Sequence, residues 1–286
     1  MKKITLTLAG ILTCSLIFSQ TQVINPLFTN KIVLHNDQTI MVQTNLSLES
    51  SFSQGMELTN KSITGYKLVV KSITDNKYTI SSTMTKVKME MDMMGQINNF
   101  DSDKKEDMES ETGKLFMEKI NRPEDVIIES STGRDITVKK KEKKTDVNED
   151  NPTQGLLNIF EQKTGNTAVT GAFELIPAGK NVGDSWLDST IEKGLKSIRT
   201  YTLKSLTDKE AVLQLIEVID ATNTIDFQGM SLDFISNTKT ATEIITDITT
   251  GLVQKRTSQS EVNGSMQLMG QDVPISAKVS SVSTYQ

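Results

Sequence analysis

The chain has 286 residues, and its 36 acidic side chains outnumber its 31 basic ones, which gives a net charge of −5. A protein that binds nucleic acid needs a basic face, so this balance argues against nucleic acid as a partner. The only cysteine, Cys14, lies near the N-terminus. Disulfides therefore cannot hold the fold together, and a packed hydrophobic core must do so.

The first 19 residues predict a secretory signal peptide. A basic pair opens the segment, residues 4–18 are mostly apolar, and Ser19 is a small residue before the expected cleavage site. This stretch is too short to span a bilayer as a helix, and no later apolar run is long enough. We therefore expect an exported protein, periplasmic or at the cell surface, without a transmembrane segment in the mature chain. The alternative is lipidation at Cys14, which the bulky Thr13 before it disfavours.

An internal repeat is the most informative feature of the remaining sequence. VKSITDNKYTI at 70–80 returns as LKSLTDKEAVL at 203–213, with a lysine, a serine, a threonine and an aspartate in the same places. A second match, between VIIESSTG and IITDITTG, aligns Gly133 with Gly251. Repeated sequence indicates that one supersecondary unit has been used twice.

The repeat predicts two homologous units, residues 30–138 and residues 166–286. Between them, residues 139–165 hold a basic block, an acidic block and a short apolar stretch, which predict a charged connector followed by a short helix. Whether the two units share one sheet or form two lobes stays open at this point.

Alternation of apolar and polar residues, together with abundant threonine, serine, valine and isoleucine, predicts strands through most of both units. Closely spaced turn signals indicate an antiparallel meander. The predicted fold is mainly β, with antiparallel meander sheets from an internal duplication, curved or shaped as a half-barrel. One or two short helices are expected, over 104–120 and 152–163.

Residues 78–93 show the alternation best and predict one long strand. Its apolar phase slips after Met84, and one extra residue near Thr85 would restore a continuous apolar face, as a β-bulge does. At about 3.3 Å per residue such a strand must bend or coil. In the second unit, AVLQLIEVI at 211–219 is apolar on both faces and predicts a central strand covered on both sides.

The apolar face of this long strand is the first candidate site. We expect it to line a cavity for an apolar ligand, because methionine forms adaptable apolar surfaces. A copper site is the less favoured reading, since the aligned Ile225 and Phe227 cannot ligate and no cysteine or histidine lies nearby. A filled core is the structural alternative, and neither a metal nor a cofactor is expected. The candidate lining residues are Val87, Met89, Met91, Met93, Ile225, Phe227 and Trp186.

Asp101 and Asp103 carry the rival hypothesis, a hydrolase of the cell envelope that uses carboxylates. It is weaker, because their aligned partners are Ile235 and Asn237 and the sequence holds no nucleophile elbow, zinc helix or phosphate loop. The only histidine, His35, is predicted to be structural. A third hypothesis is a purely structural or partner-docking module of the envelope.

The signal peptide, the segment IPAGKNVGDSW at 176–186 and the closing segment at 251–282 resemble an uncharacterised family of exported, β-rich proteins from Gram-negative bacteria. This resemblance implies no catalytic or binding residues. The alternating strands with a helix or two are also similar to the half-barrels of periplasmic lipoprotein carriers, in which a curved sheet shields an acyl chain. That similarity is an analogy of fold only.

The first functional hypothesis rests on the apolar inward face of the long strand, Val87, Met89, Met91 and Met93. It is an exported, non-enzymatic protein that binds an apolar ligand or acyl chain, with a lipid or another envelope protein as its partner.

Overall fold

The structure is a computed structural model that describes residues 28–52, 56–137, 167–192, 194–227, 230–268 and 271–286. The predicted signal peptide with Cys14, nearly all of the connector and the helix expected over 152–163 lie outside these residues. No helix within the described ranges is long and apolar enough to cross a membrane.

Antiparallel strands dominate the structure and confirm the predicted β class. The described residues also form three short helices, α1 (Lys105–Glu109), α2 (Glu111–Met117) and α4 (Thr167–Thr170). The strands are β1 (Thr39–Phe52), β2 (Met56–Thr74), β3 (Lys77–Met93), β4 (Gln96–Asp101), β5 (Pro123–Glu129), β6 (Ser185–Glu192), β7 (Leu195–Leu206), β8 (Glu210–Phe227), β9 (Met230–Asp247), β10 (Val253–Leu268) and β11 (Gln271–Tyr285).

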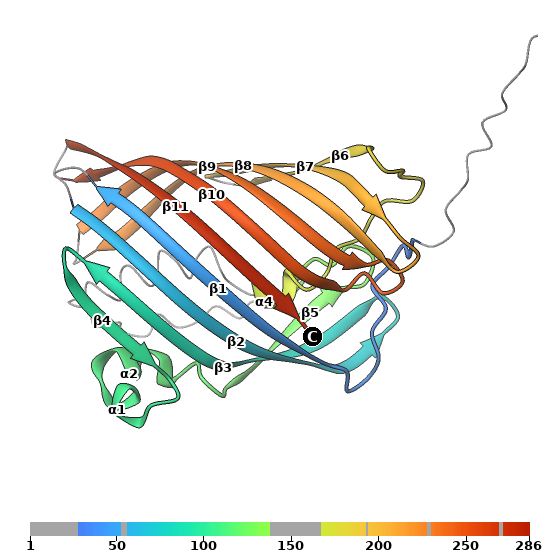
Figure 1. The fold of residues 1–286 in the computed structure, drawn as a ribbon, viewed down its shortest axis with the longest axis horizontal. Coiled ribbons are helices and arrows are strands. Elements are labelled where there is room, and N and C mark those ends of the chain that lie inside the picture. The colour runs from blue at the N-terminus through green and yellow to red at the C-terminus, as the bar shows by residue number, and fades with distance from the viewer. Residues whose placement is uncertain (1–27, 53–55, 138–166, 193, 228–229, 269–270) are drawn as a thin grey trace, which may run out of the picture.

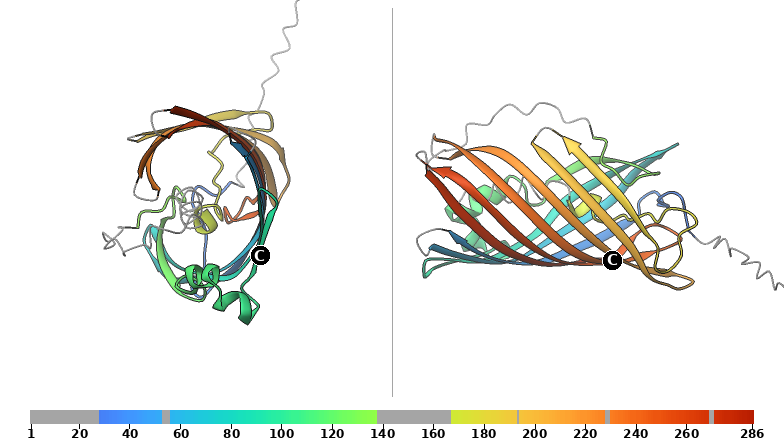
Figure 2. Two further views of the ribbon diagram at one scale, coloured as in Figure 1. Left: turned by 90° about the vertical axis from the view of Figure 1, so that its left-hand side faces the viewer. Right: turned by 90° about the horizontal axis from the view of Figure 1, so that it is seen from above.

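All eleven strands belong to one sheet, whose order is β4-β3-β2-β1-β11-β10-β9-β8-β7-β6, with β5 also paired to β3. β1, near the start of the described chain, pairs with β11 at its end. This pairing joins the two predicted units into one continuous sheet and rules out two separate lobes. The sheet curls strongly about the direction of its strands but stays open, with β6 at one edge and β4 and β5 at the other (Figures 1 and 2).

The two repeats occupy equivalent places in this sheet. The hairpin of β2 and β3 contains the first copy, and the hairpin of β7 and β8 contains the second. Both copies shift their register at the same position, because Lys71 and Lys204 are each passed over in the pairing. β9 runs unbroken where the first unit has β4 and β5, which are separated by α1 and α2. The duplication is therefore visible in the topology.

The second pair of matched segments also forms equivalent turns. Gly133 donates its backbone N–H to Glu129 O, and Gly251 donates to Asp247 O, both at 2.9 Å. Both glycines have positive φ, +69° and +74°, a conformation that glycine adopts without strain. Between the two turns passes Ile32, whose N–H donates to Ser130 O at 2.8 Å.

We expect Gly251→Ala to destabilise the fold more than Gly95→Ala does. Both glycines have positive φ, so each alanine costs about 1–2 kcal/mol in backbone strain. Only at Gly251 would the new Cβ also lie 2.9 Å from Leu175 Cδ2, whereas nothing lies within 4 Å at Gly95. Urea unfolding of the two variants measures the difference, and equal losses would contradict this packing around the turn.

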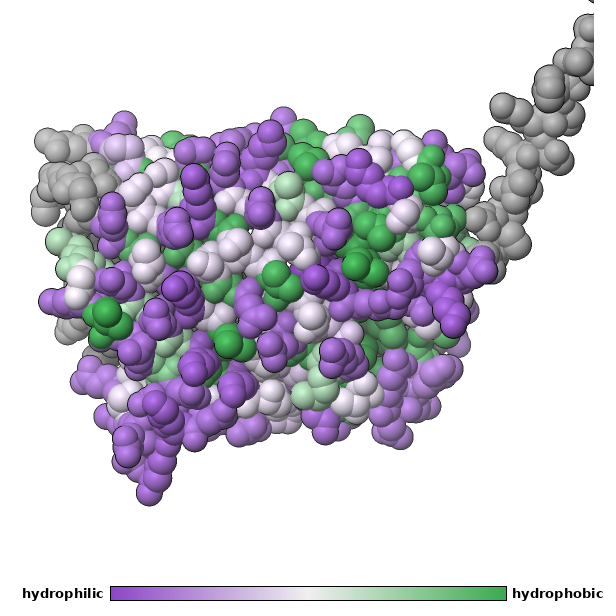
Figure 3. All heavy atoms as spheres, viewed as in Figure 1, coloured by the Kyte–Doolittle hydropathy of each residue, from purple (hydrophilic) through white to green (hydrophobic). Residues whose placement is uncertain are grey.

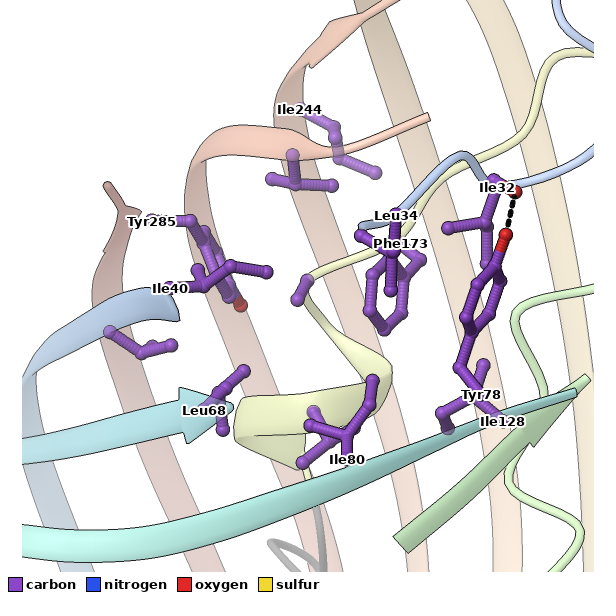
Figure 4. Packing of buried hydrophobic residues seen from close by; sticks show 14 of the residues in the cluster. Ile32, Leu34, Ile40, Leu68, Tyr78, Ile80, Ile128, Phe173, Ile244 and Tyr285 are labelled. Carbon is purple, nitrogen blue, oxygen red and sulfur yellow. Dashed lines mark hydrogen bonds between the residues drawn. The ribbon is translucent and has the colours of Figure 1, made fainter. Parts of the chain in front are cut away.

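The larger hydrophobic core fills one end of the curved sheet. Segment 28–38 and the segment that includes α4 run inside the curve at this end (Figure 2), and their apolar side chains meet those of the strands (Figure 4). Tyr78 fixes the contact, since its hydroxyl donates to Ile32 O at 2.7 Å. The most deeply buried members include Ile32, Ile80, Ile128, Val169, Ala172, Leu203, Leu213 and Ile244.

The predicted bulge in β3 is confirmed. Gly65 lies opposite Lys86 and Tyr66 lies opposite Met84, so Thr85 is the extra residue. Because of it, Val87, Met89 and Met91 are buried on the same face as Ile80. Lysines and acidic residues alternate with them on the outer face of β3. The outer surface in the view of Figure 3 is largely hydrophilic, with scattered hydrophobic residues.

Two expectations need correction. The helix predicted over 104–120 is broken into α1 and α2, because Ser110 adopts an extended conformation and its side chain accepts from Gly113 N as the N-cap of α2. β8 is an interior strand of the sheet, but the described residues do not cover it on both faces. Ala211, Leu213 and Leu215 on its inner face are buried, whereas Val212, Ile216 and Val218 on its outer face are only half-buried.

Candidate ligand-binding face

The concave face of the sheet, here called the inner face, carries the candidate site. Residues directly opposite each other on neighbouring strands share a face, so the pairing defines rows that cross the sheet. The row through Met91 is apolar at its start and in its middle, apart from Asn60, and polar or charged from β10 onward. In order from β3 to β6 it contains Met91, Asn60, Leu48, Val279, Ser260, Thr240, Glu217, Arg199 and Asp188.

The apolar side of the inner face holds a methionine cluster. Met89 and Met91 are 6% and 5% exposed, and they pack with Val87, Leu48, Leu58, Phe100 and Phe116. Phe116 comes from α2, and its ring stacks on Phe100 at 5.1 Å between centroids. Met93, in contrast, is 39% exposed. The structure thus brings three of the sequence-predicted residues together beneath α2.

Next to the methionine cluster lies a patch of half-buried apolar side chains on β1, β10 and β11, here called the inner strip. Leu46, Ala277 and Val279 pack against the cluster from the side. Val262 and Ile275 extend the strip, because Val262 lies opposite Ala277 and Ile275 is two residues before Ala277 on the same face. The strip is therefore apolar surface on the inside of the curve that the described residues only partly cover.

Charged groups on the other side of the inner face neutralise one another. Arg199 donates from Nε to Glu217 Oε1 at 2.8 Å and from Nη1 to Asp188 Oδ2 at 3.3 Å. Arg134 donates to Asp188 Oδ1 at 3.3 Å, and Ser197 donates to Glu217 Oε1 at 2.8 Å. Burial lowers the pKa of Arg199, but the attraction of Glu217 and Asp188 outweighs it and raises the pKa overall. The arginine stays charged and paired.

Trp186 lies on the inner face but far along the sheet from the methionines, since it is on β6 at the opposite edge. Its ring stacks on Tyr201 at 5.4 Å and packs against the larger core, and Lys180 Nζ lies 5.8 Å from its centroid. Burial, reinforced by the negative charge of Glu174, raises the pKa of Tyr201. Ile225 and Phe227 belong to β8, opposite Leu232 and Met230, but their side chains lie outside the described residues.

The carboxylates of the hydrolase hypothesis are ion-paired at the surface. Asp103 bonds to Lys86, and Lys88 Nζ lies 3.6 Å from Asp101 Oδ2. The hydrogen bond from Asp103 N–H, aided by the two lysines, lowers the pKa of Asp101 against the effect of burial. A general acid needs the opposite shift. No three histidine, cysteine or acidic residues in the described ranges are grouped to hold a metal ion.

Sequence reasoning missed the charged side of the inner face and a second ion pair, Arg256 with Glu174. Arg256 Nη2 donates to Glu174 Oε2 at 2.7 Å, and Nε donates to Gly171 O at 2.8 Å. The sequence did contain one sign of the charged side of the inner face, because Glu217 interrupts the apolar run at 211–219. Nothing in the local sequence indicates its partners on β6 and β7.

These features define an open, curved β-sheet protein with an amphipathic inner face. The chain belongs to a family of unknown function (DUF6263), whose model matches residues 75–253, more than half of its length. The match begins in the turn between β2 and β3 and ends at the first residue of β10, just after the turn that contains Gly251.

Comparisons with solved structures give distant likenesses. Lipovitellin, in a structure of its lipid–protein interactions, is 12% identical at a TM-score of 0.49; the alignment covers 89% of this chain and 26% of lipovitellin. An outer membrane channel from Pseudomonas putida F1 is 9% identical at a TM-score of 0.28, and the alignment covers 89% of this chain and 97% of the channel. OccK5 of Pseudomonas aeruginosa is 6% identical at a TM-score of 0.26, and the alignment covers 88% of this chain and 99% of OccK5. All three TM-scores lie below 0.5. No curated protein sequence matches the chain.

Proposed function

We propose that this chain is an exported, non-enzymatic binding protein of the cell envelope that holds an acyl chain or a similar apolar ligand on the inner strip. One observation carries the proposal. Leu46, Ala277 and Val279 form apolar surface that is only half-buried, on the concave side of the sheet and beside the methionine cluster. Ligand sites are concave and mostly apolar, with a few polar groups that orient the ligand.

The chemistry of the strip suits a chain of methylene groups. Each methylene moved from water onto an apolar surface contributes about 0.8 kcal/mol. Met89 and Met91, which border the strip, have flexible and polarisable side chains that adjust to ligands of different shape. The polar side of the inner face provides a boundary where the apolar part of a ligand ends.

Filling the strip with a large side chain should abolish binding. We expect Ala277→Trp to bind diphenylhexatriene, a fluorescent hydrocarbon, at least about tenfold more weakly than the wild type, because the indole occupies the ligand's place. The matched control is Ala241→Trp, which lies on the outer face of β9 and should bind as the wild type does. Fluorescence titration measures both, and thermal melts check that both variants fold.

Two results would contradict the binding function. One is a wild type that does not bind the hydrocarbon, and the other is equal binding by Ala277→Trp and Ala241→Trp. Export rests on the predicted signal peptide at residues 1–19. It is tested by fractionating cells, since a full-length chain confined to the cytoplasm would refute it.

A further inference from the structure

Four side-chain polar atoms on the inner face are buried without a hydrogen-bond partner. They are Ser50 Oγ, Asn60 Oδ1, Ser236 Oγ and Thr238 Oγ1. Their residues are between 3% and 9% exposed. Buried polar groups are nearly always paired, and leaving one unpaired costs free energy, so a native structure that holds four of them in one region calls for an explanation.

The four groups border the inner strip on both sides. One row of the sheet runs from Ser50 through Ala277 and Val262 to Thr238. Asn60 is the diagonal neighbour of Ser50 on β2, and Ser236 comes two residues before Thr238 on the same face of β9. Along the sheet, Ser50 and Thr238 are three strand spacings apart, which is about 14 Å. Apolar surface therefore lies between two pairs of unpaired polar groups.

Neighbouring polar groups show that such pairing is the rule elsewhere on this face. Thr240, the next inner-face threonine on β9, bonds to Ser260 at 2.8 Å. Thr242 bonds to Ser258 at 2.9 Å, and Thr44 bonds to Ser283 at 2.8 Å. The charged groups Arg199 and Glu217 also bond to each other. The unpaired groups are thus confined to the ends of the inner strip.

We infer that the ligand is a neutral lipid of the acylglycerol class, whose ester and hydroxyl groups pair with Ser236 and Thr238 at one side of the inner strip while its acyl chain lies on the strip. This inference rests on the proposed function. The hydroxyls of Ser236 and Thr238 donate to ester oxygens of the ligand. Ser50 and Asn60, about 14 Å away across the strip, lie beyond the reach of the same head group.

The charge distribution selects against an anionic lipid. In the row from Ser50 to Thr238, every described residue is uncharged. Both arginines on the described inner face are already paired, Arg199 with Glu217 and Asp188, and Arg256 with Glu174. A carboxylate or phosphate placed on the strip would lose its hydration without gaining an unpaired cation from the described residues of this face, and this loss disfavours binding.

Three ligands of equal chain length test the inference by calorimetric titration: a monoacylglycerol, the corresponding fatty acid and the corresponding alkane. We expect the monoacylglycerol to bind the full chain roughly tenfold more tightly than either of the others, because only it hydrogen-bonds without carrying a charge. Equal affinity for all three would overturn the inference and leave the proposed function standing. Failure of all three to bind, together with no binding of diphenylhexatriene, would refute the proposed function itself.

Two matched threonine variants locate the contact. Thr238→Val should bind the monoacylglycerol roughly fivefold more weakly, bind the alkane as before, and melt no lower than the wild type, because the lost hydroxyl has no partner in the protein. Thr240→Val removes a hydroxyl that is already bonded to Ser260, so it should melt lower and bind both ligands unchanged. If the two variants have the same effect on monoacylglycerol binding, the assignment is wrong.

Discussion

Replacing Met91 with aspartate is expected to reduce the free energy of unfolding by more than about 4 kcal/mol, in the range that only severe core lesions reach. Met91 is 5% exposed and packs among apolar side chains of the methionine cluster. A carboxylate there would be buried without a cation to pair with. Urea unfolding and thermal melting measure the loss.

Two controls on the same strand separate burial from other effects. Met93→Asp changes the next residue on the same face, which is 39% exposed, so it should cost far less. Met91→Leu keeps the apolar volume and should cost less than about 1.5 kcal/mol. If Met91→Asp folded as stably as Met93→Asp, this part of the inner face would point to water, and both the core and the adjoining strip would be misassigned.

Replacing Arg256 with methionine is expected to cost about 3–5 kcal/mol, because it leaves Glu174 buried without its partner. The guanidinium bonds to Glu174 Oε2, Gly171 O and Phe173 O, and so it fastens the segment around α4 to β10 inside the sheet. The double variant Arg256→Met/Glu174→Gln should recover part of the loss, since it removes the unpaired charge. If the double variant recovered none of the lost free energy of unfolding, the attachment of the α4 segment to β10 through this ion pair would be contradicted.

The pH dependence of Arg256→Met gives a second check. Burial raises the pKa of Glu174 above its ordinary value of 4.5, and Arg256 opposes this rise. Without Arg256 the folded-state pKa rises further, so the folded state binds a proton more readily than the unfolded state does. The stability that protonation of Glu174 contributes is then fully present below pH 4.5, and it is lost as the pH rises through the folded-state pKa of this residue. The deficit of the variant relative to the wild type should therefore shrink in acid.

Features encoded locally were predictable from the sequence. The repeat placed two equivalent hairpins, the phase slip at Thr85 placed the bulge in β3, and the alternation gave the buried face of Met89 and Met91. Each of these signals depends on residues close together in the chain, where the period of two fixes which face a side chain occupies.

Features that depend on pairing between distant strands were not predictable. The contact of β1 with β11, which makes one sheet, joins residues more than 200 positions apart and leaves no periodic trace in either strand. The same is true of Arg199, whose partners Asp188 and Glu217 come from the strands on either side. The inner strip depends on that same pairing of β1 with β11. The sequence therefore indicated the methionines that border the strip and not the strip itself.

The central claim is that the inner strip, on the concave face, contacts an apolar ligand. A photoactivatable crosslinker at position 277 of the full chain, expressed in its own cells and illuminated there, tests the claim most directly. Position 241, on the outer face of β9, serves as the control. We predict lipid-sized mass additions to the protein labelled at 277 and none to the protein labelled at 241. Equal labelling at both positions, or no lipid at 277, would contradict the claim.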